Sequence, residues 1–151
     1  MKVTQLRSKD LNALLEQYHL SFSKKDSVQL QEGEHKLILV NKKPCFFYYG
    51  ERVIPTVKFL LEQNVLDPIT VDMGAVKFVV NGADIMRPGI VAIDPKIKKD
   101  GVISIIDVNN KKPLAVGIAL YGAAEMEKMS SGKVIKNIHY FGDSIWKNDN
   151  Q

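Results

Sequence analysis

Residues 71–90, VDMGAVKFVVNGADIMRPGI, constrain the fold most strongly, because they carry the signals for both ends of one short helix. Asp72 occupies an N-cap position, where its carboxylate accepts backbone N–H bonds. Asn81 and Gly82 tolerate the left-handed backbone conformation that ends many helices. The stretch therefore predicts a helix of about two turns, followed at once by a loop that extends to Gly89.

Strand signals surround this helix. The segment ITV before it predicts a short strand, and IVAI, GVISIIDV and LAVGIAL after it predict three more, with NNKKP as a hairpin turn. A second short helix is expected in AAEMEKMSSG and a final strand in KVIKNIHYFGDSIW. This order of elements favours a small, nearly closed β-barrel with two short helices.

The segment before the barrel predicts a smaller unit of a different kind. In SKDLNALLEQYH, the apolar residues Leu11, Leu14, Leu15 and Tyr18 follow helical spacing, and Ser8 can serve as the N-cap. VQLQ, HKLILVN and CFFYYG then predict three strands of an antiparallel meander. IPTVKFLLEQN predicts a second helix with its proline at the start.

We therefore expect an α+β chain of two domains, a helix-plus-antiparallel-sheet domain over residues 1–67 and the barrel over residues 68–151. The boundary is placed at Asp67-Pro68, a short joint rather than a flexible linker. A length of 151 residues suits two small domains that share a boundary. A content of 45% apolar and 25% charged residues is typical of globular proteins.

The charge permits a polyanionic partner without requiring one. The formal net charge is +4 and the sequence pI is about 9.1.

The sequence has one cysteine, Cys45. It lies in the apolar run CFFYY, which predicts a buried, unreactive thiol. The histidines His19, His35 and His139 fall in no metal-ligand spacing, so neither a metal nor a cofactor is expected. The N-terminus lacks an apolar signal region, and no apolar run approaches the length of a membrane span, so we expect a soluble, cytoplasmic protein.

Acid–base catalysis has one candidate set in the second half, namely Asp72, Asp84 and His139. Each has a better structural interpretation: Asp72 as a helix cap, Asp84 as a turn former and His139 as a strand residue near solvent. The sequence also contains no G-x-S-x-G, P-loop or G-x-G-x-x-G motif. We therefore do not expect an enzyme.

A binding surface is the alternative use of the loop GADIMRPGI. Gly82 and Gly89 lack side chains that would hold a partner's backbone away, and Lys77 and Arg87 can supply positive charge. Backbone N–H groups near Gly82 and Ala83 can donate to phosphate or ribose oxygens. The other interpretation, equally open from the residues alone, is that the glycines serve only the turn.

Together, the order VDMGAVKFVVNGADIMRPGI, PLAVGIAL and GKVIKNIHYFGDSIW resembles a PUA domain, an RNA-binding module named after pseudouridine synthases and archaeosine transglycosylases. IPTVKFL ahead of it and NIHYFGDSIW at the end extend the resemblance to the malignant T-cell-amplified sequence family, with an archaeal-type relative as the expected form. Members of that family join a small N-terminal domain to a C-terminal PUA domain, and the eukaryotic ones act in translation on the small ribosomal subunit.

The resemblance implies a non-catalytic, translation-related protein that binds structured RNA, either tRNA or ribosomal RNA. A protein-interaction adaptor, docking a translation factor or ribosomal protein through its N-terminal domain, is the alternative. Carried onto matching positions, the RNA-binding surface of PUA domains corresponds to Lys77, Gly82, Ala83, Asp84, Met86, Arg87, Pro88, Gly89, His139 and Tyr140.

Overall fold

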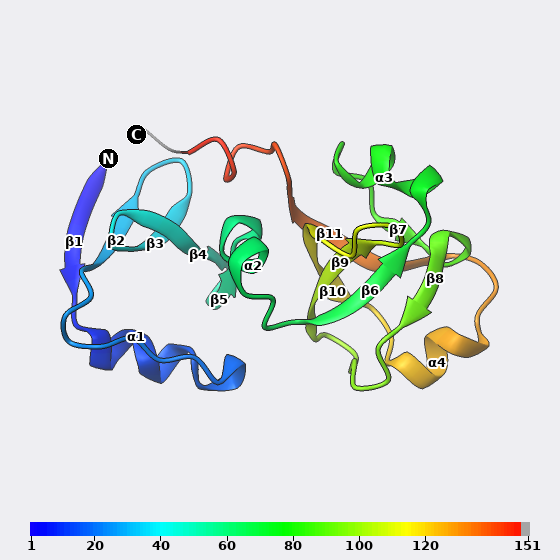
Figure 1. Ribbon diagram of the computed structural model, residues 1–151, viewed down its shortest axis with the longest axis horizontal. Coiled ribbons are helices and arrows are strands. Elements are labelled where there is room, and N and C mark those ends of the chain that lie inside the picture. Colours follow the sequence, from blue (N-terminus) through cyan, green and yellow to red (C-terminus); the bar gives the residue numbers. More distant parts are fainter. Residues whose placement is uncertain (149–151) are drawn as a thin grey trace.

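The computed structural model describes residues 1–148, in which two β-sheets lie next to each other (Figure 1). Within these residues, the first sheet has five strands in the order β1-β2-β3-β4-β5, and the second has six in the order β7-β11-β10-β9-β6-β8. The expected α+β architecture is confirmed: an antiparallel-sheet domain precedes a nearly closed barrel with short helices.

The N-terminal domain is a meander covered by two helices. Its elements are β1 (Lys2–Leu6), α1 (Ser8–Leu14), a 3-10 turn (Glu16–Tyr18), β2 (Val28–Glu32), β3 (Lys36–Val40), β4 (Lys43–Tyr49), β5 (Arg52–Pro55) and α2 (Val57–Glu62). The three expected strands are β2, β3 and β4, whereas β1 and β5 were not predicted.

Both expected helix starts in this domain were misplaced. Ser8 is already inside α1, and Arg7 precedes that helix without a side-chain cap. Pro55 belongs to β5, and the hydroxyl of Thr56 caps α2 by accepting a hydrogen bond from the backbone N–H of Phe59. Helix α1 thus begins one residue earlier than expected, whereas α2 begins later because strand β5 extends to Pro55.

The C-terminal domain has the expected two helices and one strand that was not predicted, β7. Its elements are β6 (Asp67–Val71), α3 (Met73–Val79), β7 (Ile85–Met86), a 3-10 turn (Arg87–Gly89), β8 (Ile90–Ile93), β9 (Val102–Asp107), β10 (Pro113–Ala119), α4 (Ala123–Lys128) and β11 (Lys133–Tyr140). Strand β6 pairs in parallel with β9 and antiparallel with β8, which brings α3 and the loop after it to one end of the sheet.

The C-terminal half of the chain contributes to the core of the N-terminal domain. After β11 the chain returns across the N-terminal domain (Figure 1), and Ile145 is buried in that domain's hydrophobic cluster. The backbone carbonyl of Asp100 accepts a hydrogen bond from the Arg52 guanidinium at 2.9 Å, and Asn64 donates to the Ser104 hydroxyl at 3.0 Å. These contacts tie the meander to the barrel.

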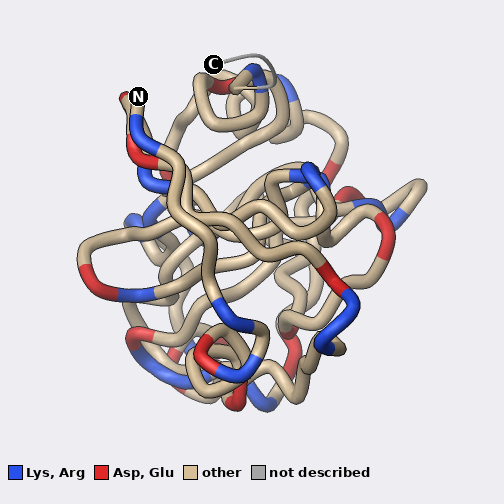
Figure 2. Tube along the Cα trace, turned by 90° about the vertical axis from the view of Figure 1, so that its left-hand side faces the viewer, with Lys and Arg blue, Asp and Glu red and all other residues tan. Residues whose placement is uncertain are grey.

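The boundary at residues 67/68 remains our proposal, and the last three residues of the expected second domain lie outside the described residues. Figure 2 shows positive and negative residues interspersed over the end of the molecule that the N-terminal domain forms. The modest net charge is therefore not gathered into a basic patch at that end.

Candidate nucleic-acid interface

Helix α3 begins and ends as its sequence predicts. The Asp72 carboxylate accepts a hydrogen bond from the backbone N–H of Ala75 at 2.9 Å. Gly82 has φ +88°. The N–H of Gly82 donates to the carbonyl of Val79, and the N–H of Ala83 donates to that of Phe78, each at 3.0 Å. This is a Schellman motif, in which the residue with positive φ ends the helix.

These backbone bonds correct one expectation about the loop. The N–H groups of Gly82 and Ala83 were expected to be free to donate to phosphate or ribose oxygens. Both donate instead to carbonyls of the last turn of α3. The last carbonyls of a helix need hydrogen-bond donors, and here the N–H groups of the residues just after the helix supply them. The loop therefore presents side chains to a partner rather than these two N–H groups.

A pocket of about 460 Å³ lies between α3 and the segment that follows it. One wall is the helix and the other is β7 with the 3-10 turn. A backbone hydrogen bond from Asp72 to the carbonyl of Gly89, 3.0 Å long, joins the start of the helix to the end of the loop. The residues that line the pocket are Asp72, Gly74, Ala75, Phe78, Val79, Ala83, Asp84, Ile85, Met86, Pro88 and Gly89.

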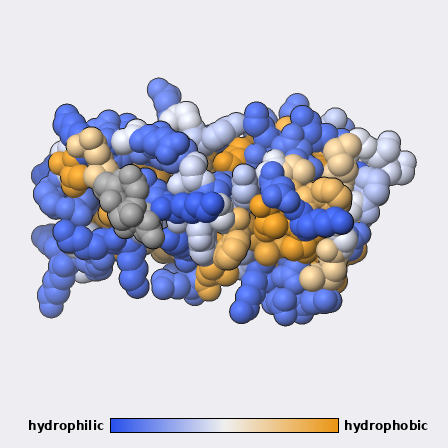
Figure 3. Space-filling model, turned by 90° about the horizontal axis from the view of Figure 1, so that it is seen from above, coloured by the Kyte–Doolittle hydropathy of each residue, from blue (hydrophilic) through white to orange (hydrophobic). Residues whose placement is uncertain are grey.

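Exposed apolar side chains surround this pocket. Phe78 is 57% exposed and Met86 is 50% exposed, and both line the same pocket, so they form an apolar patch rather than isolated exposed residues. Figure 3 shows apolar side chains gathered over the C-terminal domain in the view that faces α3. The Lys77 ammonium lies 5.2 Å from the centre of the Phe78 ring, so a positive charge accompanies the aromatic surface.

Two of the expected contact residues have structural bonds of their own. The Arg87 guanidinium donates to the carbonyls of Met126 at 2.7 Å and Ile90 at 3.2 Å, which connects the loop to α4. One carboxylate oxygen of Asp84 accepts from the backbone N–H of Asn137 at 2.9 Å, and the other lies 3.4 Å from the Lys133 ammonium. Both residues therefore stabilise the shape of the loop. Asp84 also lines the pocket, whereas Arg87 lies beside it.

Gly82 and Tyr140 meet directly. A Cβ placed on Gly82 would lie 2.9 Å from Cε1 of the Tyr140 ring, closer than two carbon atoms can approach. The space beside Gly82 is therefore filled by Tyr140, not left open to a partner's backbone. A Cβ on Gly89 would lie 3.4 Å from that of Ala75, which is close to an ordinary contact, so the packing does not require glycine at position 89 as it does at position 82.

His139 was expected on the RNA-binding surface, and the structure corrects this. Its side chain is fully buried between the two domains, with its ring 5.1 Å from that of Phe47 in β4. The pairing of β10 with β11 is irregular at this point, because Val116 pairs with His139 and Gly117 with Asn137. Because neighbouring residues of a strand point to opposite sides, His139 faces the N-terminal domain while Tyr140 packs on the barrel core.

Asp72, Asp84 and His139 do not form a catalytic set. Each is hydrogen-bonded separately, to Ala75, to Asn137, and to Val57 and Asp143.

Asn137 is a residue of this site that the sequence did not suggest. Its side-chain amide donates to the carbonyls of Val79 at 3.0 Å and Ala83 at 3.1 Å, on both sides of the helix end. With its backbone bond to Asp84, Asn137 fastens the whole loop to β11. No local pattern identifies such a residue, because its partners lie more than fifty positions away in the chain.

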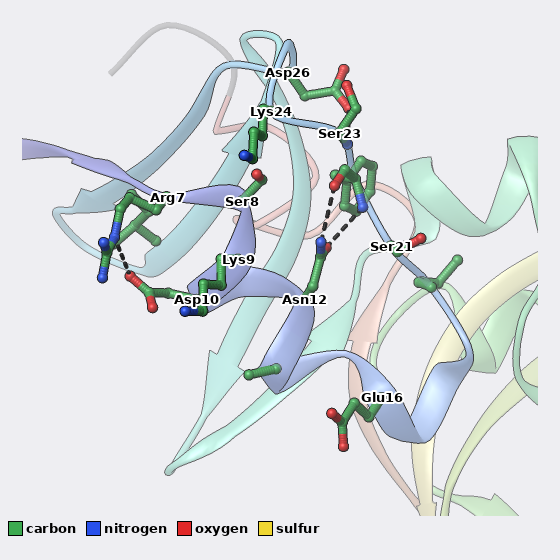
Figure 4. Close-up of a pocket in the computed structure, with 14 residues that line it drawn as sticks. Arg7, Ser8, Lys9, Asp10, Asn12, Glu16, Ser21, Ser23, Lys24 and Asp26 are labelled. Carbon is green, nitrogen blue, oxygen red and sulfur yellow. Dashed lines mark hydrogen bonds and ion pairs between the residues drawn. The ribbon is translucent and has the colours of Figure 1, made fainter.

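A larger depression, of about 1200 Å³, lies beside α1 in the N-terminal domain, and Figure 4 shows its lining. Its polar groups already bond to one another: the Asn12 amide pairs with the backbone of Phe22 in both directions, and Arg7 pairs with Asp10. Across residues 1–148 no cluster of three metal-ligating side chains is found. In the same range, no helix has the length and apolar character needed to cross a membrane.

Comparison with known proteins agrees with this architecture. Residues 68–141 match the model of the PUA domain, and residues 6–63 match a domain of unknown function, DUF1947. The chain is 34% identical to malignant T-cell-amplified sequence 1 of Rattus norvegicus over 149 residues, which cover 89% of this chain and 82% of that protein. The chain belongs to the malignant T-cell-amplified sequence family of PUA-domain proteins.

Other members of the family are similar along most of their length. An uncharacterized protein of Methanocaldococcus jannaschii is 40% identical, with 93% of each chain covered. Translation machinery-associated protein 20 of Saccharomyces cerevisiae is 33% identical, with 82% of this chain and 73% of that protein covered. The pocket beside α3 is thus part of a PUA domain, and the domain before it is DUF1947.

Solved structures share the whole two-domain arrangement. A hypothetical protein from Pyrococcus horikoshii OT3 superposes with a TM-score of 0.84 at 33% identity, covering 98% of this chain and 99% of that one. A conserved PUA domain protein from Thermoplasma acidophilum superposes with a TM-score of 0.83 at 27% identity, with the same coverage. The DUF1947–PUA pairing is therefore a shared architecture.

Proposed function

We propose that this chain binds structured RNA, tRNA or ribosomal RNA, through the pocket beside α3, performs no chemistry, and acts in translation. The observation that carries the proposal is the exposed, apolar pocket of the PUA domain, with Phe78 and Met86 at its edge and Lys77 over the aromatic ring. The names of the relatives, which include a translation machinery-associated protein, support the cellular role.

The chemistry of the surface indicates how RNA would be held. An exposed aromatic ring stacks on any base or packs on a ribose, and apolar walls favour a nucleotide removed from its stack. The proposed contacts are the side chains of Lys77, Phe78, Ala83, Met86 and Pro88, with Gly82, Asp84, Arg87, Gly89 and Tyr140 shaping the loop. His139 is not included, because it is buried.

Few positive charges face this pocket. Arg87 bonds to two backbone carbonyls and Lys133 pairs with Asp84, which leaves Lys77 as the nearest exposed charge among the expected contacts. Because each neutralised phosphate contributes about 0.9 to the logarithmic salt slope, we expect a modest affinity with a shallow dependence on salt.

Crosslinking in cells, followed by sequencing of the bound RNA, tests the proposal. Tagged wild-type protein should enrich tRNA or ribosomal RNA, and Phe78→Ala should lose that enrichment. Leu14→Ala is the matched control, since Leu14 is an exposed apolar residue of the N-terminal domain, 43% accessible. Enrichment no greater than that of a protein with the same net charge would reject RNA binding.

A protein-interaction adaptor is the second candidate, and one groove favours it. A groove of about 530 Å³ lies between the β3–β4 turn, α2 and the C-terminal segment. Its floor is apolar and includes Leu61 and Trp146, and Lys42, Lys43 and Lys58 lie along it. Phe46 and Phe47 of the neighbouring strand β4 are buried, so they are not available to a docking partner.

The two candidates separate on cosedimentation with small ribosomal subunits. If the RNA surface is primary, Phe78→Ala should release the protein from subunits while the pair Lys42→Glu and Lys43→Glu leaves it bound. If the protein docks as an adaptor, the pair Lys42→Glu and Lys43→Glu should release it from subunits, while Phe78→Ala should leave it bound.

A further inference from the structure

The imidazole of His139 joins the two domains through a hydrogen bond that requires one protonation state. Its Nε2 atom lies 3.0 Å from the backbone nitrogen of Val57, the first residue of α2. A backbone N–H can only donate, so Nε2 must be the acceptor and must carry no proton. The proton of the neutral ring is therefore on Nδ1.

Asp143 holds the other side of the ring. Its carboxylate oxygens lie 2.9 and 3.0 Å from Nδ1 of His139. The same carboxylate accepts hydrogen bonds from the backbone N–H groups of Tyr140 and Trp146. Burial works to raise the pKa of Asp143, but the hydrogen bond from His139 and these two N–H groups hold that pKa below its ordinary value. The carboxylate is thus the anion that orients the ring.

The surroundings of the ring contain no competing charge in the described contacts. Phe47 of β4 packs edge-on, and Val116 of β10 pairs beside the histidine. From α2 the ring meets the backbone of Val57, while the neighbouring Lys58 ammonium lies over the Trp146 ring, 4.9 Å from its centre. A further titratable group at this turn is His35, which contacts the Ser144 hydroxyl at 2.7 Å.

The same strand reaches the proposed RNA-binding loop. Asn137, two residues before His139, fastens the loop, and Tyr140, the next residue, fills the space beside Gly82. Because Asp143 bonds both the His139 ring and the Tyr140 backbone, one carboxylate connects the domain junction to the residue that packs against Gly82 at the end of α3. A continuous set of contacts therefore runs from α2 to Gly82.

We propose that His139 and Asp143 are positioning residues that form a proton-sensitive coupling between the docking of α2 and the shape of the RNA-binding loop. A proton added at Nε2 turns the acceptor into a donor that faces the Val57 N–H, so the two groups separate. Asp143 retains the charged ring, because an imidazolium pairs well with a carboxylate. Protonation of His139 therefore alters the contact with α2 directly. Through Asp143 and Tyr140, it also alters the packing at Gly82. The effect on RNA binding rests on the function proposed above.

The first test uses the full chain without RNA. Backbone amide spectra of the labelled protein are recorded between about pH 8 and 5, the range in which imidazole titrates. The Val57 and Gly82 amides should move together in one step. Exchange of the Val57 amide should accelerate at least about tenfold beyond its intrinsic pH dependence, as expected for loss of a buried hydrogen bond. His19→Asn and His35→Gln are matched controls that should keep this step, because His139 is the remaining histidine of the sequence.

Two variants separate coupling from simple packing. His139→Gln offers an amide oxygen to Val57 without a titrating ring, so the step should disappear while the Val57 amide stays protected. Asp143→Asn removes the anion that orients the ring, so the Val57 amide should be unprotected throughout the range. A step that persists in His139→Gln overturns the proposal, as does a Gly82 amide that does not respond when Val57 does.

The second test measures binding of unfractionated tRNA. Affinity of the wild type should fall by about fivefold across the same range, the lower end of typical coupling between sites, and His139→Gln should not show this fall. An equal fall in both proteins overturns the coupling to RNA. If the wild type binds no tRNA at the upper pH, the proposed function fails, while the amide experiment still decides whether the proton-sensitive junction exists.

Discussion

The phenol ring of Tyr140 occupies the space in which a side chain at position 82 would lie, 2.9 Å from the nearest ring carbon. Gly82 is also in the left-handed region, with φ +88°. The glycine is thus required twice, once by the helix end and once by the packing of β11 against it. This contact packs the end of α3 closely against the last strand.

Replacing Gly82 with alanine should therefore be more costly than an ordinary glycine substitution. Backbone strain in the left-handed region contributes about 1–2 kcal/mol, and the displaced tyrosine adds to it. The free energy of unfolding in urea measures the total. Gly132→Ala is the matched control, because Gly132 has φ +93° and open space around its Cβ position. Equal losses for the two variants would show that Tyr140 does not press on residue 82.

Asn137→Ala should loosen the loop from β11. It removes two hydrogen bonds to loop carbonyls, and we expect a loss of about 1–3 kcal/mol in unfolding free energy, together with weaker tRNA binding. Asn64→Ala removes a comparable side-chain bond to Ser104 at the domain junction. That control should reduce stability without changing RNA affinity beyond its stability effect. An Asn137 variant that binds RNA as the wild type does would show that the loop keeps its shape without this residue.

Tyr18 should make stability depend on pH in the alkaline range. Burial raises the pKa of its hydroxyl to about 12, against a smaller lowering by Arg52, and the hydroxyl donates to the Val53 carbonyl at 2.6 Å. A pKa raised in the folded state gives stability that is complete below the unfolded pKa of about 10 and is lost as the pH rises towards 12. The loss should approach about 2–3 kcal/mol.

Urea unfolding of the wild type and Tyr18→Phe at successive pH values isolates this contribution, because all other groups are common to both proteins. The phenylalanine variant should be less stable near neutral pH, and the difference should shrink as the pH rises above about 10. A difference that stays constant would show that the hydroxyl titrates as it does in the unfolded chain.

The sequence predicted those elements of the fold whose ends are marked by recognisable capping or turn residues. Asp72 and Gly82 cap α3 as expected, and the hairpin between β9 and β10 turns at Lys111, which has φ +56°. Strand β1 has four exposed residues in its five, so no alternating apolar pattern marks it. Strand β7 has two residues and exists because Ile85 and Met86 pair with β11.

The candidate site was predicted in outline, and its errors arise from long-range contacts. Loop residues 83–86, 88 and 89 do line the pocket beside α3, but the burial of His139 depends on the packing of the N-terminal domain against β11, which no local pattern shows. Phe78 was placed in the helix but not in the site, although an aromatic residue beside Lys77 on the polar face of α3 was the available signal. Asn137 had no signal at all, since its partners are distant in the sequence.

The affinity of the full chain for fluorescently labelled tRNA, measured by anisotropy, tests RNA binding at the PUA pocket most directly. The combined variant Lys77→Gln and Phe78→Ala should bind at least about tenfold more weakly, since one stacked base contributes about 1–3 kcal/mol. The combined control Lys9→Gln and Leu14→Ala removes the same charge and an exposed apolar residue from α1, and it should bind as the wild type does. Equal affinities for all three proteins would contradict RNA recognition by the pocket beside α3.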